Sequence, residues 1–348
     1  MLSNLSSNVV LAKARAMYGR RLTEKQYRDL LACHTVSEIA AYLKNNTSYQ
    51  RVLSGINETD IHRGRLENLL RQKIFEDSAS LCRYEITVGE HFAEYILQKA
   101  EIQQISRCVM HLMAGTPEEY LFSMPTFLNK HSRINLLALG QVQSFQDLLQ
   151  ALEHTPYANL LRRFTPTYGQ NLDYFGIENC LYQYLYQRCF SIVRNQTSGE
   201  TRRQLEDLFH VYADVENYTS ILRLKFNYRS GPDFIKSSLL PFGTLKPHQI
   251  DALLAAETPE AFYKELDTTS FGKRIQGLSQ NIDRFAYEAK YAVARKEIRF
   301  STHPSVVLLS YMFLMEIELH DITNIIEGVR YQIPTEEIEK LLTIIHFP

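Results

Sequence analysis

Glycine and proline are scarce in this sequence, with 14 and 11 among 348 residues, and few stretches alternate between polar and apolar residues. Because glycine and proline interrupt helices and alternation is typical of strands, this scarcity predicts a mostly helical chain. The five cysteines are odd in number and form no Cys-x-x-Cys pair. They therefore indicate neither a disulfide framework nor a cysteine zinc site, and they fit buried thiols in a reducing cytosol.

The sequence also lacks an excess of charge of one sign and a long apolar run. Its 38 basic and 39 acidic residues give a formal net charge of −1, whereas nucleic acid binding calls for a basic field. The most apolar stretch, residues 306–315, contains Ser310 and is followed by Glu316, so it is shorter than the roughly 20 residues of a membrane span. It is predicted to be a buried helix. No apolar core follows a basic start, so we expect no secretion signal and no direct lipid span.

Motifs that carry chemistry are absent as well. Gly272-Lys273 is followed by Arg274 and has no second glycine five residues before it, so it is not a phosphate loop. The eleven histidines are scattered, without His-Glu-x-x-His or a Cys/His cluster at zinc spacing. His320-Asp321 is interpreted as part of a repeated structural element described below. We therefore assign no catalytic, cofactor-binding or metal residue, expect no cofactor, and predict that the chain is not an enzyme.

A short pattern occurs three times along the chain. Leu-Leu-Ala stands at residues 30–32, 136–138 and 253–255, and a Thr-x-aromatic element begins at Thr47, Thr155 and Thr269. The spacings of that threonine are 108 and 114 residues, and a third of the chain is 116. A fixed period of this kind predicts one helical unit used three times.

Between these two elements, each copy carries the signal for the start of a helix. A hydroxyl residue, Thr35, Ser144 or Thr258, stands at the expected N-cap, where its oxygen can accept a bond from a free backbone N–H. Glu38 and Asp147 follow their caps by three residues, close to a capping box. Apolar residues four and eight positions after each cap then form a stripe that faces a core.

A second repeated element combines an acid, a branched apolar residue and an amide, at residues 101–104, 214–217 and 321–324. With these elements in one order, the chain is predicted to divide into helical repeats at residues 1–113, 114–228 and 229–348, with the C-terminal helix packed near the N-terminal helix. The helix that carries Phe175, Tyr182, Tyr184 and Tyr186 presents either a binding surface or an apolar face buried between domains.

These residues together resemble a known family. The segments at residues 12–17, 30–31, 38–39 and 43–49, continued by 214–217, 253–254 and 321–326, are similar to the C subunit of the prokaryotic V-type (A-type) ATPase/ATP synthase, whose eukaryotic relatives are called the d subunit. The resemblance covers essentially the whole chain and includes its threefold repeat. The individual motifs are mostly core and cap residues, and their combination in this order is what makes the resemblance specific.

The resemblance implies an all-α fold of three similar helical domains in a funnel-shaped, pseudo-three-fold arrangement. It implies a non-catalytic central-stalk rotor subunit, a socket that couples the D–F shaft to the membrane rotor ring of c/K subunits and transmits torque for ATP-driven ion transport or ATP synthesis. We then expect a cytoplasmic, peripheral location, a monomer when isolated, and no binding of nucleotide. The partner-binding residues stay unknown, because the repeated residues are the buried ones. The alternative is a helical-repeat adaptor or scaffold unrelated to a rotary ATPase.

Overall fold

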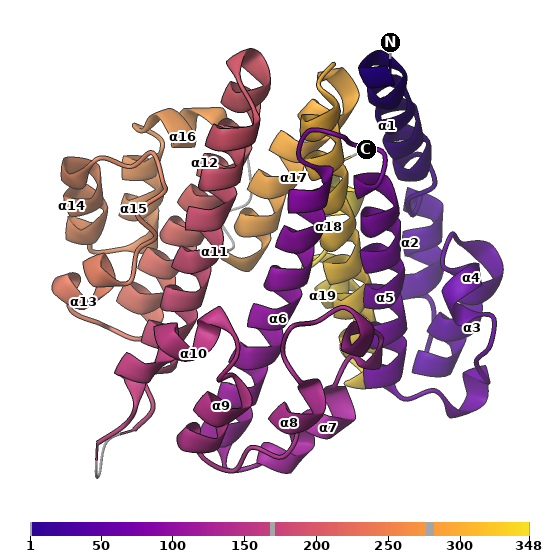
Figure 1. Ribbon diagram of the computed structural model, residues 1–348, viewed down its shortest axis with the longest axis horizontal. Helices are drawn as coiled ribbons and strands as arrows, with labels where there is room; N and C mark the ends of the chain where they lie inside the picture. The colour runs from indigo at the N-terminus through magenta and orange to yellow at the C-terminus, as the bar shows by residue number, and fades with distance from the viewer. Residues whose placement is uncertain (1, 168–170, 276–281, 348) are drawn as a thin grey trace. The chain divides into compact units, whose positions relative to one another are not determined.

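The computed structural model describes residues 2–167, 171–275 and 282–347, and within these ranges all regular secondary structure is helical. The predicted all-α class is confirmed. The long helices are α1 (Leu2–Tyr18), α5 (Arg63–Cys82), α6 (Gly89–Ala114), α11 (Tyr174–Gln196), α12 (Gly199–Leu222), α17 (Ile282–Phe300) and α18 (Pro304–Arg330). They can be followed in Figure 1.

Short helices connect the long ones. They are α2 (Glu24–Leu31), α3 (Val36–Asn46), α4 (Gln50–Leu53), α7 (Tyr120–Ser123), α8 (Leu136–Leu139), α9 (Phe145–Ala151), α10 (Pro156–Leu161), α13 (Pro232–Ser237), α14 (Pro247–Ala255), α15 (Pro259–Leu266), α16 (Ser270–Arg274) and α19 (Thr335–Glu339). A π-helical turn, Arg223–Asn227, extends α12, and a 3₁₀ turn, Ile344–His346, follows α19.

The chain forms two compact units. The smaller unit comprises residues 91–192, and the larger unit comprises residues 1–90 and 193–348. In the larger unit α18 is the central helix, in contact with α1, α5, α12 and α17. Every residue from Val306 to Met315 is buried, so the predicted buried helix is confirmed.

The predicted N-caps are present in all three copies. The hydroxyls of Thr35, Ser144 and Thr258 accept bonds from the backbone N–H three residues on, at 3.1, 3.2 and 3.2 Å. Asp147 completes a reciprocal capping box, because its carboxylate accepts the Ser144 N–H at 2.9 Å. Glu38 differs, since its carboxylate accepts the N–H of His34, one residue before the cap, at 2.7 Å.

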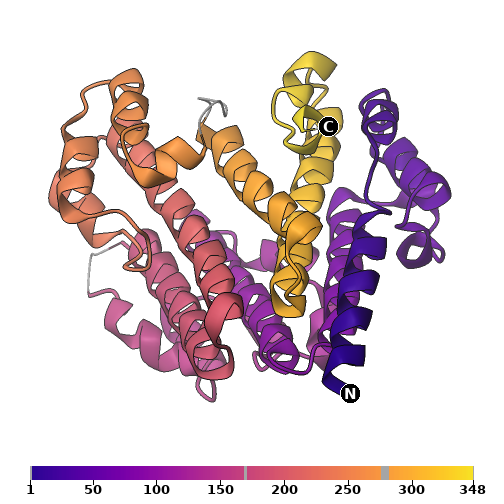
Figure 2. The same cartoon turned by 90° about the horizontal axis from the view of Figure 1, so that it is seen from above.

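Both ends of the chain contribute to one lobe of the larger unit. The N-terminal lobe consists of α2, α3 and α4, and the C-terminal segment consists of α19 and the turn Ile344–His346. Helix α19 contacts α2, and α18 contacts α1, α2, α3, α19 and that turn. In Figure 2 the yellow C-terminal segment accordingly lies beside the indigo and violet N-terminal lobe.

The smaller unit contains most of α6, the short helices α7–α10 and most of α11. Three tyrosines in the middle of α11 differ in how far they are buried. Tyr186 is buried, Tyr182 and Tyr184 are half-buried, and the ring of Tyr184 meets that of Tyr157 edge to face at 6.1 Å between centroids. Within the described ranges, none of the helices combines the length and the apolar character that a membrane crossing requires.

Candidate functional site

A buried carboxylate on α6 holds the short helices of the smaller unit. Glu101 is 1% exposed and accepts bonds from the Arg133 backbone N–H at 2.6 Å and the Ser132 hydroxyl at 3.0 Å. Its second oxygen accepts a bond from the hydroxyl of Tyr157, the aromatic residue of the Thr-x-aromatic element, at 2.7 Å. Glu101 therefore joins α6 to the segment before α8 and to α10, and the short helices α8–α10 form the lobe that it holds.

Asp214 on α12 does the same in the third copy. Its two oxygens accept bonds from the backbone N–H and the hydroxyl of Thr244, at 2.7 and 2.6 Å, just before α14. The aromatic residue of this copy is Phe271, which has no hydroxyl, and its ring stacks on Tyr218 of α12 at 4.9 Å. Ring stacking here takes the place of the hydrogen bond made by Tyr157 in the smaller unit.

On α18 two acids, Glu318 and Asp321, hold neighbouring segments, whereas α6 uses the single acid Glu101. Asp321, the acid predicted from the repeat, accepts bonds from the backbone N–H groups of Thr343 and Ile344 at 2.9 and 2.8 Å. Glu318, one helical turn earlier, accepts bonds from the Leu22 N–H at 2.8 Å and the Tyr49 hydroxyl at 2.9 Å. Glu318 thus makes to the N-terminal lobe the contacts that Glu101 makes to its own lobe. The sequence analysis missed Glu318.

The three amides of the repeated element make unlike contacts. Asn217 both donates to the Leu240 carbonyl at 2.9 Å and accepts from the Leu240 N–H at 2.7 Å. Asn324 bonds to the His320 ring at 3.1 Å, and Gln104 accepts from the Tyr120 hydroxyl at 3.4 Å. His320 also stacks on Tyr287 at 3.6 Å between ring centroids. The ring of His320 is therefore held between Tyr287 and Asn324.

Burial dominates the electrostatics of the acids in the larger unit. It raises the pKa of Asp214, Glu318 and Asp321, the last to about 7, although the N–H groups bonded to each carboxylate act in the opposite direction. The charge of Glu318 adds to the rise in the pKa of Asp321. A carboxylate that is buried without a cation favours its protonated form.

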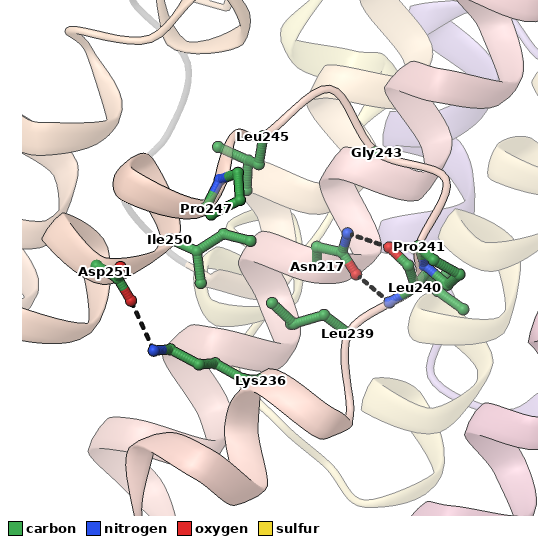
Figure 3. A pocket seen from close by; sticks show the side chains of 10 residues that line it. All are labelled: Asn217, Lys236, Leu239, Leu240, Pro241, Gly243, Leu245, Pro247, Ile250 and Asp251. Atoms are coloured by element: carbon green, nitrogen blue, oxygen red, sulfur yellow. Dashed lines mark hydrogen bonds and ion pairs between the residues drawn. The ribbon is translucent and has the colours of Figure 1, made fainter.

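A cavity of about 360 Å³ lies among α12, α13 and α14 (Figure 3). Its lining is mostly apolar, with Lys236 and Asp251 paired at 2.6 Å and Asn217 already bonded to the chain at Leu240. No group of three or more metal-ligating side chains gathers anywhere in the described part of the chain. The polar side chains among the lining residues are thus paired with one another or with the backbone.

Exposed apolar residues recur at one position of the repeat. Leu121, Phe234 and Leu341 each stand twenty residues after the acid of the acid-x-x-amide element and are 46%, 44% and 40% exposed. They lie on α7, on α13 and just after α19, the short helices that follow the three acid-bearing helices. Exposed apolar side chains are candidates for contact with a partner. Aligning the three copies at their acids would have found them.

The family model described as ATP synthase (C/AC39) subunit matches residues 10–341 of the chain. The chain belongs to this family. It is therefore a subunit of a V/A-type ATPase and a structural subunit rather than the catalytic one, as the resemblance implied. Membership argues against the alternative of a scaffold unrelated to a rotary ATPase.

Curated relatives of this C/AC39 chain are named as the C subunit of the A-type ATP synthase. The protein of Desulfurococcus sp. (strain SY) is 23% identical over 338 residues, which cover 95% of this chain and 88% of the relative. That of Methanosphaera stadtmanae is 23% identical over 348 residues, covering 95% and 86%. That of Archaeoglobus fulgidus is 21% identical over 339 residues, covering 97% and 96%. The similarity therefore extends over nearly the full length of both chains.

Proposed function

We propose that this C/AC39 chain is the socket of the central stalk, which receives the D–F shaft and rests on the membrane rotor ring on its cytoplasmic face. In this role it transmits torque between ATP turnover and ion movement and performs no chemistry itself. The observation that carries the proposal is the set of buried carboxylate junctions on α6, α12 and α18, which tie the short helices to the long ones. Satisfied buried hydrogen bonds of this kind make a stiff body, as torque transmission requires.

The proposal includes three repeats, at residues 1–113, 114–228 and 229–348. With these bounds, Glu101, Asp214 and Glu318 each lie in one repeat and hold the backbone N–H of a residue that precedes the Leu-Leu-Ala helix of another repeat. The lobe of the first repeat is held by α18, so the last repeat supports the first.

Binding to the isolated shaft tests the socket role. Calorimetry of the purified chain with purified D–F shaft, at two salt concentrations, is expected to give saturable one-to-one binding. A polar contact would weaken strongly at the higher salt concentration, because salt screens exposed charges. Absence of binding at tens of micromolar (~10⁻⁵ M, about −7 kcal/mol), with all partners folded, would contradict the proposal.

The recurring exposed residues are proposed to contact the ring. A ring of identical subunits presents the same surface many times, whereas the shaft is a single copy, so equivalent residues on three repeats suit the ring. Serine at Leu121, Phe234 and Leu341 together is expected to weaken binding to the detergent-purified ring by about a hundredfold, since each truncated contact contributes about 1 kcal/mol.

The control for this variant carries serine at Val9, Ile86 and Phe300, which are also exposed but lie outside that position of the repeat. Its affinity for the ring should equal that of the unmodified chain. Titration of the chain onto the immobilised, detergent-purified ring measures both affinities. Equal weakening by the two triple variants would mean that the recurring position has no special part in ring binding.

A further inference from the structure

Two buried carboxylates on α18 hold the two ends of the chain. Glu318 binds the N-terminal lobe through Leu22 and Tyr49, and Asp321 binds the C-terminal segment through Thr343 and Ile344. The two acids are one helical turn apart, 1% and 0% exposed, and therefore face the same side of α18. Both attachments thus depend on one small buried region.

This region has only neutral hydrogen-bond partners. Among the described residues, no basic side chain lies within ion-pair distance of either carboxylate, and all four bonds come from backbone N–H groups or a tyrosine hydroxyl. The hydroxyl of Tyr27 is buried, and it has no hydrogen-bond partner among the described residues. Burial raises the pKa of that hydroxyl, and the charges of Asp321 and Glu318 raise it further.

The charged and titratable groups that act on the pair come from several neighbouring elements. Those that act on Glu318, Asp321, Tyr27 or Tyr49 are Arg21 after α1, Tyr27 of α2, Tyr49 before α4, Lys73 and Asp77 of α5, Tyr291 of α17 and Tyr311 of α18. Lys73, the base on α5 that acts on Glu318, already pairs with Asp77 at 2.9 Å. The pair therefore has no cation of its own to balance two negative charges.

We propose that the buried pair of Glu318 and Asp321 carries one proton at neutral pH and forms a pH-sensitive clasp that holds the N-terminal lobe and the C-terminal segment on α18. Two adjacent buried carboxylates cannot both ionise without a large electrostatic penalty, so they titrate as a coupled pair. The proton is taken from water on closing and returned to water on opening. Loss of this proton at higher pH leaves two charges in the core, and the clasp loosens so that water can reach them.

The sign of the effect follows from the folded and unfolded pKa values. The pKa of Asp321 rises from 3.8 to about 7 on folding, so between these pH values the folded state holds a proton that the unfolded state has lost. Stability from this group is complete below the unfolded pKa and falls as the pH rises toward 7. The equilibrium constant for folding should fall by up to about tenfold per pH unit across that window.

Urea unfolding of the full chain from pH 4.5 to 8, compared with the variants Asp321→Asn and Glu101→Gln, tests the clasp. Asparagine at 321 removes the titrating group, so the pH slope should shrink by the one-proton contribution even if the overall stability is lower. Glutamine at 101 removes an equally buried carboxylate in the smaller unit and should leave the slope of the larger unit unchanged. An unaltered slope in Asp321→Asn would overturn the proposal.

A second measurement holds even if Asp321→Asn fails to fold. Carboxyl carbon NMR of the unmodified chain, labelled at Asp and Glu, should show a member of the pair titrating near pH 7. Hydrogen-exchange protection factors of the Leu22, Thr343 and Ile344 amides should fall over the same range, because they are the donors of the clasp. Titration of both carboxyls below pH 5, or protection that does not change with pH, would overturn the clasp.

Discussion

Replacing Glu318 with alanine is expected to destabilise the larger unit by about 2–4 kcal/mol. The change leaves the Leu22 N–H and the Tyr49 hydroxyl buried without an acceptor, and each unsatisfied buried donor costs about 1–3 kcal/mol. Part of the loss is offset, because the ionised carboxylate is itself unfavourable beside Asp321. Urea unfolding at a fixed pH of 6 measures the effect as a change in midpoint.

Two further variants make this result specific. Tyr49→Phe removes only one of the two bonds to Glu318 and should cost less than Glu318→Ala, about 1–2 kcal/mol. Glu257→Ala removes an exposed acid outside any helix and should change the free energy of unfolding by less than about 0.5 kcal/mol. A Glu318→Ala protein as stable as Glu257→Ala would show that Glu318 does not hold the N-terminal lobe.

Phe313→Ala is expected to destabilise the larger unit by about 3–5 kcal/mol. Phe313 is 1% exposed on α18, stacks on Tyr212 of α12 at 3.9 Å between ring centroids, and meets the edge of Phe209 at 6.1 Å. Alanine would leave a cavity between two long helices that cannot close without moving both. Thermal unfolding followed by circular dichroism measures the loss as a drop in the melting temperature.

The matched control is the same substitution at Phe300, which is 75% exposed at the end of α17. Phe300→Ala should change the free energy of unfolding by less than about 0.5 kcal/mol, because surface substitutions remove little packing. If both variants lost the same stability, the packing of α12 against α18 would not be a main support of the larger unit.

Local features of the fold could be predicted from the sequence because their causes lie within a few residues. The N-caps Thr35, Ser144 and Thr258 bond to the N–H three residues on, and the sequence contains everything that such a bond needs. The buried stretch 306–315 is visible for the same reason, since a helix that is apolar on every side has to be buried.

Contacts between distant parts of the chain could not be predicted in this way. Glu318 bonds to Tyr49 and Leu22 across 269 and 296 residues. Tyr49 is the first-copy equivalent of Tyr157, so the repeat pairs it with Asp321 rather than with Glu318. The repeat pointed to Asp321 and not to Glu318. The lobe that Glu318 holds lies at the start of the chain, whereas the lobes held by Glu101 and Asp214 follow their acids in the sequence. The exposed Leu121, Phe234 and Leu341 were missed because the comparison of the three copies did not extend to the position twenty residues after each acid.

Coupling of ATP hydrolysis to ion transport tests the central claim most directly. The rotary complex would be assembled in vesicles with and without this chain, and ATP hydrolysis and ion uptake would be measured together. Without the chain, we expect the peripheral head to hydrolyse ATP with no ion uptake, and addition of the purified chain should restore uptake. A complex that lacks the chain and still transports ions at the full ratio per ATP would contradict the role of a torque-transmitting socket.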